Sequence, residues 1–198
     1  EHRSEILAAM LQDQTAIDEA PAIEGVFLAE SPGATVPMIR AAQVAESDPK
    51  VGAVPDRAER LLSRSIHQAL AEAGLDHPTI QRMQSAGTRF ETVFGTTLGG
   101  MRHLGAGLRS GRLESLSRTT TATVTRTALA GTGLPLGGST VSAACASGVS
   151  TLAIAATAIL ADEADLLMAV SYDPISEFAF AGFTCLRLVS EGPLRPFT

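Results

Sequence analysis

The 198-residue sequence lacks Trp and Asn entirely, has one Tyr, and has a single Lys, Lys50, against 14 Arg. Its acidic residues outnumber its basic ones, which leaves a formal net charge of −6. A dedicated nucleic-acid-binding protein would normally be basic, so this balance argues against a nucleic-acid partner.

Cysteine is scarce as well. The two cysteines, Cys145 and Cys185, are too few for a disulfide framework. Together with four scattered histidines they offer no spacing typical of a metal site (His2, His67, His77 and His103). We therefore expect no bound metal and no structural disulfide.

Long apolar runs are also missing. The longest, from Val149 to Ala161, is interrupted by Ser150, Thr151 and Thr157 and is too short to span a membrane. No basic segment followed by an apolar one indicates a signal peptide. We expect a reduced, cytoplasmic protein, and because the chain begins at Glu1 we expect it to be a fragment.

The elements that are present alternate between helices and strands. Helical spacing of apolar residues covers 4–20, and an amphipathic helix is predicted over 56–75, with Asp56 as N-cap and Gly74 at its end. Strands are predicted at 90–95, 138–144 and 165–171, and a helix buried on most sides at 146–160. Residues 21–55 contain several prolines and look irregular, with room for a short strand at 25–29. This order predicts a layered α/β fold.

The junction before the helix at 146–160 carries Cys145 among small residues. A cysteine at the start of a helix faces unpaired backbone N–H groups and the positive end of the helix dipole, which favour thiolate over thiol. The same N–H groups can hold an oxyanion. The turn could therefore supply a nucleophile for acyl transfer, although spacing alone favours a small buried thiol.

The hexapeptide AACASG at 143–148 resembles the nucleophile turn of the β-ketoacyl-acyl carrier protein synthases, the ketosynthases of fatty-acid and polyketide synthesis, whose motif is similar to T-A-C-A-S-G. Other segments resemble the same family in the same order along most of residues 4–198: SEILAAMLQDQTAI, DRAERLLSRSIHQALAEAGL, VFGTTLGGM, EADLLMAVSYDPIS and FAFAGFTCLRLVSEGPLRPF. Several matches in order are more specific than any one of them.

The resemblance implies a thiolase-like layered α/β fold, of which residues 1–198 would be the N-terminal half, with one mixed sheet flanked by helices. It also implies a decarboxylating Claisen condensation, in which Cys145 takes an acyl group from phosphopantetheine and passes it to malonyl-acyl carrier protein. No metal or bound organic cofactor is implied. The complete enzyme would be a homodimer or a ketosynthase-type heterodimer.

The family's second half carries two histidines and a Lys that stabilise the enolate, and none of the four histidines here lies in such a motif. We therefore expect the family's first strand and its C-terminal half to be absent, and the chain alone to be inactive in condensation.

Three further assignments follow from the resemblance. Phe183 and Gly182 fall in a segment that lines the acyl pocket in the family, although a core role is equally compatible with the sequence. Cys185, in the same segment, is expected to pack internally. Residues 101–130 hold five Arg and only Glu114 as an acid, so Arg109, Arg112 and Arg118 are candidates to dock the acidic carrier protein, against the alternative of an ordinary solvated face.

Two alternatives stay open. One is a thiolase-type acyltransferase acting on coenzyme A thioesters, which also uses a Cys in a C-A-S-G-like turn. The other is a non-catalytic half or partner subunit.

Overall fold

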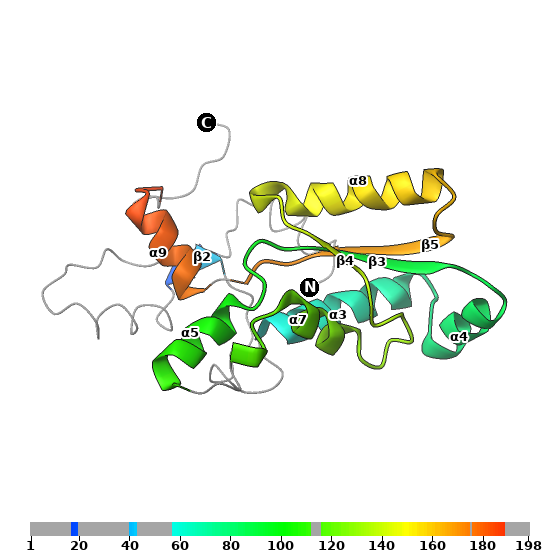
Figure 1. Cartoon of the computed structure of the whole chain (residues 1–198), viewed down its shortest axis with the longest axis horizontal. Coiled ribbons are helices and arrows are strands. Elements are labelled where there is room, and N and C mark those ends of the chain that lie inside the picture. The colour runs from blue at the N-terminus through cyan, green and yellow to red at the C-terminus, as the bar shows by residue number, and fades with distance from the viewer. Residues whose placement is uncertain (1–16, 20–39, 43–56, 112–115, 175, 189–198) are drawn as a thin grey trace, which may run out of the picture. The chain divides into compact units, whose positions relative to one another are not determined.

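The computed structural model describes residues 17–19, 40–42, 57–111, 116–174 and 176–188 (Figure 1). Along the chain the elements are β1 (Ile17–Glu19), β2 (Arg40–Ala42), α3 (Arg57–Glu72), α4 (His77–Ser85), β3 (Phe90–Gly95), α5 (Met101–Ser110), α7 (Thr121–Leu129), β4 (Ser139–Val141), the one-turn 3₁₀ helix η1 (Ala144–Ala146), α8 (Ser147–Leu160), β5 (Leu166–Ser171) and α9 (Glu177–Cys185). They divide into two compact units, residues 48–174 and residues 1–47 with 175–198.

The larger unit is built on a three-stranded sheet in the order β4-β3-β5. β3 pairs in parallel with both neighbours, with Val93 opposite Ser139 of β4 and opposite Ala169 of β5. Parallel strands need long crossover connections, and α8 forms the one that carries the chain from β4 past β3 to β5. The α/β prediction is confirmed. The described strands of this sheet pair only in parallel, however, whereas we expected a mixed sheet.

Helices cover both faces of this sheet, with α3 and α7 on one side and α8 on the other (Figure 1). The main core lies on the side of α3 and α7, where the predicted helical stripe buries Leu62, Ile66 and Leu70. Its other buried members are Ile80, Phe90, Phe94, Val124, Ala128, Leu129 and Leu134. Gly74 has the left-handed φ of 69° that lets the chain leave α3, as its predicted position requires.

The opposite face of the sheet is covered differently. The predicted helix and strand are confirmed as α8 and β5, but α8 is not buried on most sides. In α8 only Ser147 and Thr151 are buried, and β5 is half-buried rather than buried. The large apolar side chains of α8 point to solvent, with Val149, Leu152 and Leu160 exposed by 72%, 62% and 87%.

The N-terminal expectation was wrong in part. Residues 17–19 form β1, which pairs antiparallel with β2, so the helix predicted over 4–20 does not extend to these residues. β2 at 40–42 lies inside the stretch that we expected to be irregular. A three-residue strand leaves no periodic signal in a sequence, and its partner decides it. The rest of the predicted helix, the strand at 25–29 and the N-cap Asp56 lie outside the described residues.

No helix among the described residues is long and apolar enough to cross a membrane.

Candidate active site

Cys145 lies where β4 passes into α8. It is the middle residue of η1, and its thiol is free and exposed. The helix α8 begins only at Ser147, so Cys145 occupies a tight turn just before the helix rather than the first helical turn that we expected. β3, β4 and β5 are parallel, so their carboxyl ends meet at this edge of the sheet, where open α/β sheets bind their ligands.

The residue before Cys145 has an unusual backbone. Ala144 has a φ of 49°, in the left-handed region that residues other than Gly, Asn and Asp rarely adopt. Such a conformation costs about 1–2 kcal/mol and persists only where the surroundings hold it.

Two hydroxyl groups hold this turn. The Ser147 hydroxyl donates to the Ala144 carbonyl at 2.7 Å and accepts from the backbone N–H of Ala143 at 3.0 Å. The Thr97 hydroxyl, from the segment after β3, donates to the same Ala144 carbonyl at 3.2 Å. The two hydroxyl oxygens lie 3.3 Å apart.

The segment after β3 is in turn bound by a carboxylate that follows β5. Oδ1 of Asp173 accepts from the Thr96 hydroxyl at 2.9 Å and from the backbone N–H groups of Thr97 and Leu98, both at 2.8 Å. The Thr96 hydroxyl also accepts from the N–H of Gly99 at 2.9 Å. Residues after β3, β4 and β5 are therefore joined in one polar network that reaches the Ala144 carbonyl, next to Cys145.

Gly95, the last residue of β3, lets α8 approach the sheet at this point. A Cβ there would lie 2.7 Å from the carbonyl oxygen of Ser147 and 2.8 Å from a methyl carbon of Thr151. Such distances are far inside van der Waals contact. The small residue under the start of α8 thus determines how close the Cys145 turn lies to the sheet.

Sequence reasoning missed this network. It singled out Ser147 only as part of the hexapeptide, and it gave Thr97 and Asp173 no role. The available signal was that polar residues lie just after the strands predicted at 90–95 and 165–171, since the carboxyl ends of parallel strands share one edge of a sheet.

The residues predicted for the acyl pocket lie on α9. Phe183 is exposed by 50%, and a Cβ added at Gly182 would meet no other atom within 4 Å. α9 belongs to the smaller unit, whereas Cys145 belongs to the larger one, so a pocket role for these residues stays a prediction. Cys185, at the end of α9, is exposed, so our expectation that it packs internally was wrong.

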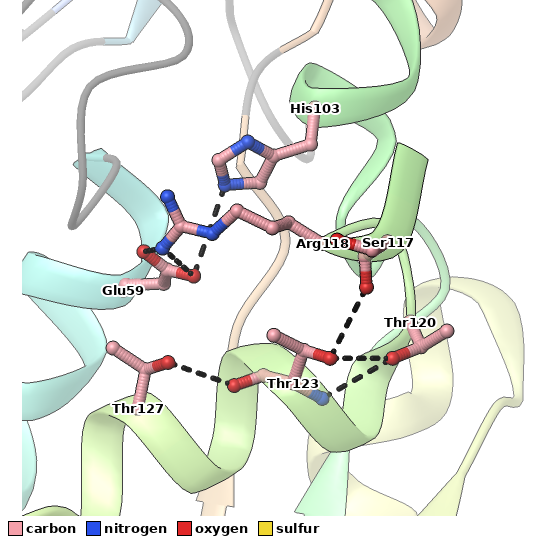
Figure 2. A network of polar contacts seen from close by, with 7 residues as sticks. All are labelled: Glu59, His103, Ser117, Arg118, Thr120, Thr123 and Thr127. Carbon is pink, nitrogen blue, oxygen red and sulfur yellow. Dashed lines mark hydrogen bonds and ion pairs between the residues drawn. The ribbon is translucent and has the colours of Figure 1, made fainter. Parts of the chain in front are cut away.

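The three arginines predicted to dock a carrier protein differ in their surroundings. Arg118 is turned inward, with a side-chain exposure of 11%, and its Nη2 donates to both carboxylate oxygens of the buried Glu59 at 2.9 and 3.1 Å (Figure 2). Nε2 of the buried His103 lies 3.7 Å from the same carboxylate. A guanidinium bound to an internal carboxylate does not present a surface charge, so we withdraw Arg118 from the docking residues.

The other two arginines keep their predicted role as a hypothesis. Arg109 belongs to α5, and Arg112 lies outside the described residues.

Among the described residues, no group of three or more His, Cys, Asp or Glu side chains is close enough to hold a metal ion.

Comparisons with known proteins agree with this geometry. A search of curated proteins found no match. Among solved structures, the crystal structure of a β-ketoacyl synthase from Burkholderia phymatum STM815 superposes with a TM-score of 0.69 at 22% sequence identity. The match covers 96% of the chain but 47% of that structure, so the chain spans about half of its length.

The family model for the N-terminal domain of β-ketoacyl synthases matches residues 3–198. The resemblance of the AACASG turn and the segments around it is therefore confirmed, and the chain belongs to the β-ketoacyl synthase family, as a thiolase-like N-terminal domain.

Proposed function

We propose that Cys145 is the nucleophile of a decarboxylating Claisen condensation in fatty-acid or polyketide synthesis. The observation that carries the proposal is the position of an exposed cysteine in a constrained turn, at the carboxyl edge of a parallel sheet, in a domain of this family.

In the first step the Cys145 thiolate attacks the carbonyl carbon of an acyl thioester on phosphopantetheine. The backbone N–H of Cys145 helps to stabilise the oxyanion of the tetrahedral intermediate. Collapse of this intermediate expels the phosphopantetheine thiolate and leaves the acyl group on Cys145.

In the second step a malonyl thioester loses carbon dioxide, and the resulting enolate attacks the acyl-Cys145 carbonyl. The new carbon–carbon bond forms as the Cys145 thiolate leaves. Groups that stabilise the enolate would come from a second half of the enzyme, which supplies two histidines in this family. The reaction needs no metal or organic cofactor.

The two steps are separable in an experiment on the 198-residue chain. Incubation with a radiolabelled small acyl thioester, followed by peptide mapping, should place the acyl group on Cys145. Radiolabelled malonyl thioester should release no carbon dioxide above background. Cys145→Ala should abolish acylation, and Cys185→Ala is the matched control that should leave it unchanged. Acylation that survives in Cys145→Ala, or that maps to Cys185, would defeat the assignment and favour a non-catalytic role.

Carrier-protein docking is a second part of the proposal. Arg109 and Arg112 lie in a stretch with a local excess of positive charge, which would steer an acidic carrier despite the negative total. Arg109→Glu with Arg112→Glu should slow acylation from an acyl-carrier protein but not from a small acyl thioester. Reversal of the exposed Arg126 in α7 serves as the control. Equal rates from the carrier substrate in both variants would rule out docking at Arg109 and Arg112.

A further inference from the structure

We propose that Asp173 and Thr97 are positioning residues for the nucleophile turn: Asp173 fixes the segment after β3, and Thr97 of that segment orients the peptide that joins Ala144 to Cys145. This inference rests on the proposed role of Cys145 as nucleophile, and neither residue is assigned contact with the substrate.

The first link runs from Asp173 to residues 96–98. One carboxylate oxygen takes three donors from consecutive residues, namely the Thr96 hydroxyl and the N–H groups of Thr97 and Leu98. Hydrogen bonds to an ionised acceptor are stronger than those between neutral groups. Three of them on one oxygen hold the backbone of this segment in one conformation, and thereby hold Thr97 in place.

The second link runs from Thr97 to the turn. The Ala144 carbonyl accepts from the hydroxyls of Thr97 and Ser147, which come from opposite sides of the turn in sequence. These bonds oppose relaxation of Ala144 from its left-handed φ of 49°. Ser147 is part of α8 itself, whereas Thr97 ties the turn to the sheet.

The third link is covalent. The carbonyl of Ala144 and the N–H of Cys145 belong to the same planar peptide unit, so a force that orients one orients the other. The proposed oxyanion donor is this Cys145 N–H. Asp173 and Thr97 therefore determine the direction in which that donor points, and a small rotation of the peptide weakens its bond to the oxyanion.

Two reactions of Cys145 separate this role from general support of the fold. Acylation by a small acyl thioester passes through an oxyanion, whereas alkylation by iodoacetamide does not. In Thr97→Val, which keeps the side-chain shape, acylation should slow by about fivefold or more and alkylation by less than about twofold. Thr97→Ser, which keeps the hydroxyl, should restore acylation. Cys185 in the same molecule is the internal reference for alkylation.

Asp173→Asn should behave like Thr97→Val, and the double variant should be no slower than the slower single variant, because both changes break one chain of contacts. Asp165→Asn is the matched control: it removes a carboxylate at the other end of β5 and should leave acylation unchanged. Thr97 and Asp173 are exposed, so neither substitution empties the core.

The outcomes distinguish the two proposals. If the unaltered chain is not acylated at Cys145, the nucleophile assignment fails and this inference falls with it. If the chain is acylated but Thr97→Val reacts at the normal rate, or if acylation and alkylation fall equally, the positioning role is overturned while Cys145 keeps its proposed function.

Discussion

The pKa of the Tyr172 hydroxyl depends on how far this side chain is buried. It follows β5 and packs against the core of the larger unit. Burial raises its pKa to about 12, and the negative charges of Asp173 and Glu59 act in the same direction. Since the chain contains no Trp and no other Tyr, the ultraviolet absorbance of tyrosinate comes from this residue alone.

We therefore expect the absorbance at 295 nm to rise with a midpoint near pH 12 in the folded chain. The same chain in urea should titrate near pH 10, the ordinary value. Because the folded-state pKa is the higher one, the contribution of Tyr172 to stability is complete below pH 10 and is lost as the pH rises towards 12. A midpoint near pH 10 in the folded chain would show that the hydroxyl is solvated.

At the scale of elements, the packing of α8 on the sheet depends on a residue without a side chain. The carbonyl of Ser147 and the methyl group of Thr151 occupy the space that a Cβ on Gly95 would need. The Cys145 turn directly precedes α8. A change at Gly95 that moves α8 should therefore alter both the stability of the fold and the position of the Cys145 turn.

Gly95→Ala should destabilise the folded chain by about 1–3 kcal/mol, because an added methyl group forces α8 away from β3. It should also slow acylation of Cys145. Gly137→Ala is the control, since a Cβ there meets nothing within 4 Å. Urea unfolding of both variants measures the difference. A Gly95→Ala chain as stable as Gly137→Ala would mean that α8 does not lie in this close contact.

The opposite ends of the same elements are joined by an exposed ionic cluster. Arg89, just before β3, contacts Asp162 at 2.6 Å and Asp165 at 2.7 Å, across the turn between α8 and β5. Hydrogen bonding to Arg89 lowers the pKa of Asp165 to about 2. Its folded-state pKa is thus below the unfolded value of 3.8.

The contribution of this pair to stability should be present above about pH 4 and should be lost as the pH falls towards 2. Asp165→Asn should lower the melting temperature near neutral pH and flatten its fall between pH 4 and pH 2. Melting curves followed by circular dichroism at a series of pH values test this. The effect should be small, because both side chains are solvated. An Asp165→Asn variant with the same melting temperature as the parent at pH 7 would contradict this prediction.

At the scale of the whole molecule, the most unusual feature is the outer side of α8. By helical spacing, Val149 and Leu160 fall on the side opposite the sheet-facing Thr151, and the exposed Leu152 lies on the flank between them. A helix that is apolar on all sides is normally buried between two layers. The larger unit covers one side of α8, and the proposed second half of the enzyme would cover the other.

The chain by itself should therefore bind a hydrophobic dye and self-associate as its concentration rises. Leu152→Gln combined with Leu160→Gln should reduce both effects with little loss of stability, because these side chains are exposed. Sedimentation at several concentrations provides the measurement. A parent chain that stays monomeric and binds no dye would show that this face is not an unpartnered interface.

The sequence by itself determined α3, α8 and the strands of the parallel sheet, together with the α/β class and the family. Strong local patterns carried this information: the stripe of Leu62, Ile66 and Leu70 for α3, the short apolar runs for β3 and β5, and the AACASG turn between β4 and α8. These signals lie within a few residues of one another, so local stereochemistry and side-chain periodicity suffice to read them.

Only the tertiary structure decided which distant residues meet. Arg118 turns inward and binds Glu59, and the hydroxyls of Thr97 and Ser147 both donate to the Ala144 carbonyl. Asp173 binds residues 96–98, a contact that joins positions up to 77 residues apart. The exposure of Cys185 and of the outer side of α8 was likewise invisible in the sequence. The physical reason is that composition shows how much charge or apolar surface a segment carries. Strand order and packing determine which other segment contacts that surface, or whether solvent covers it.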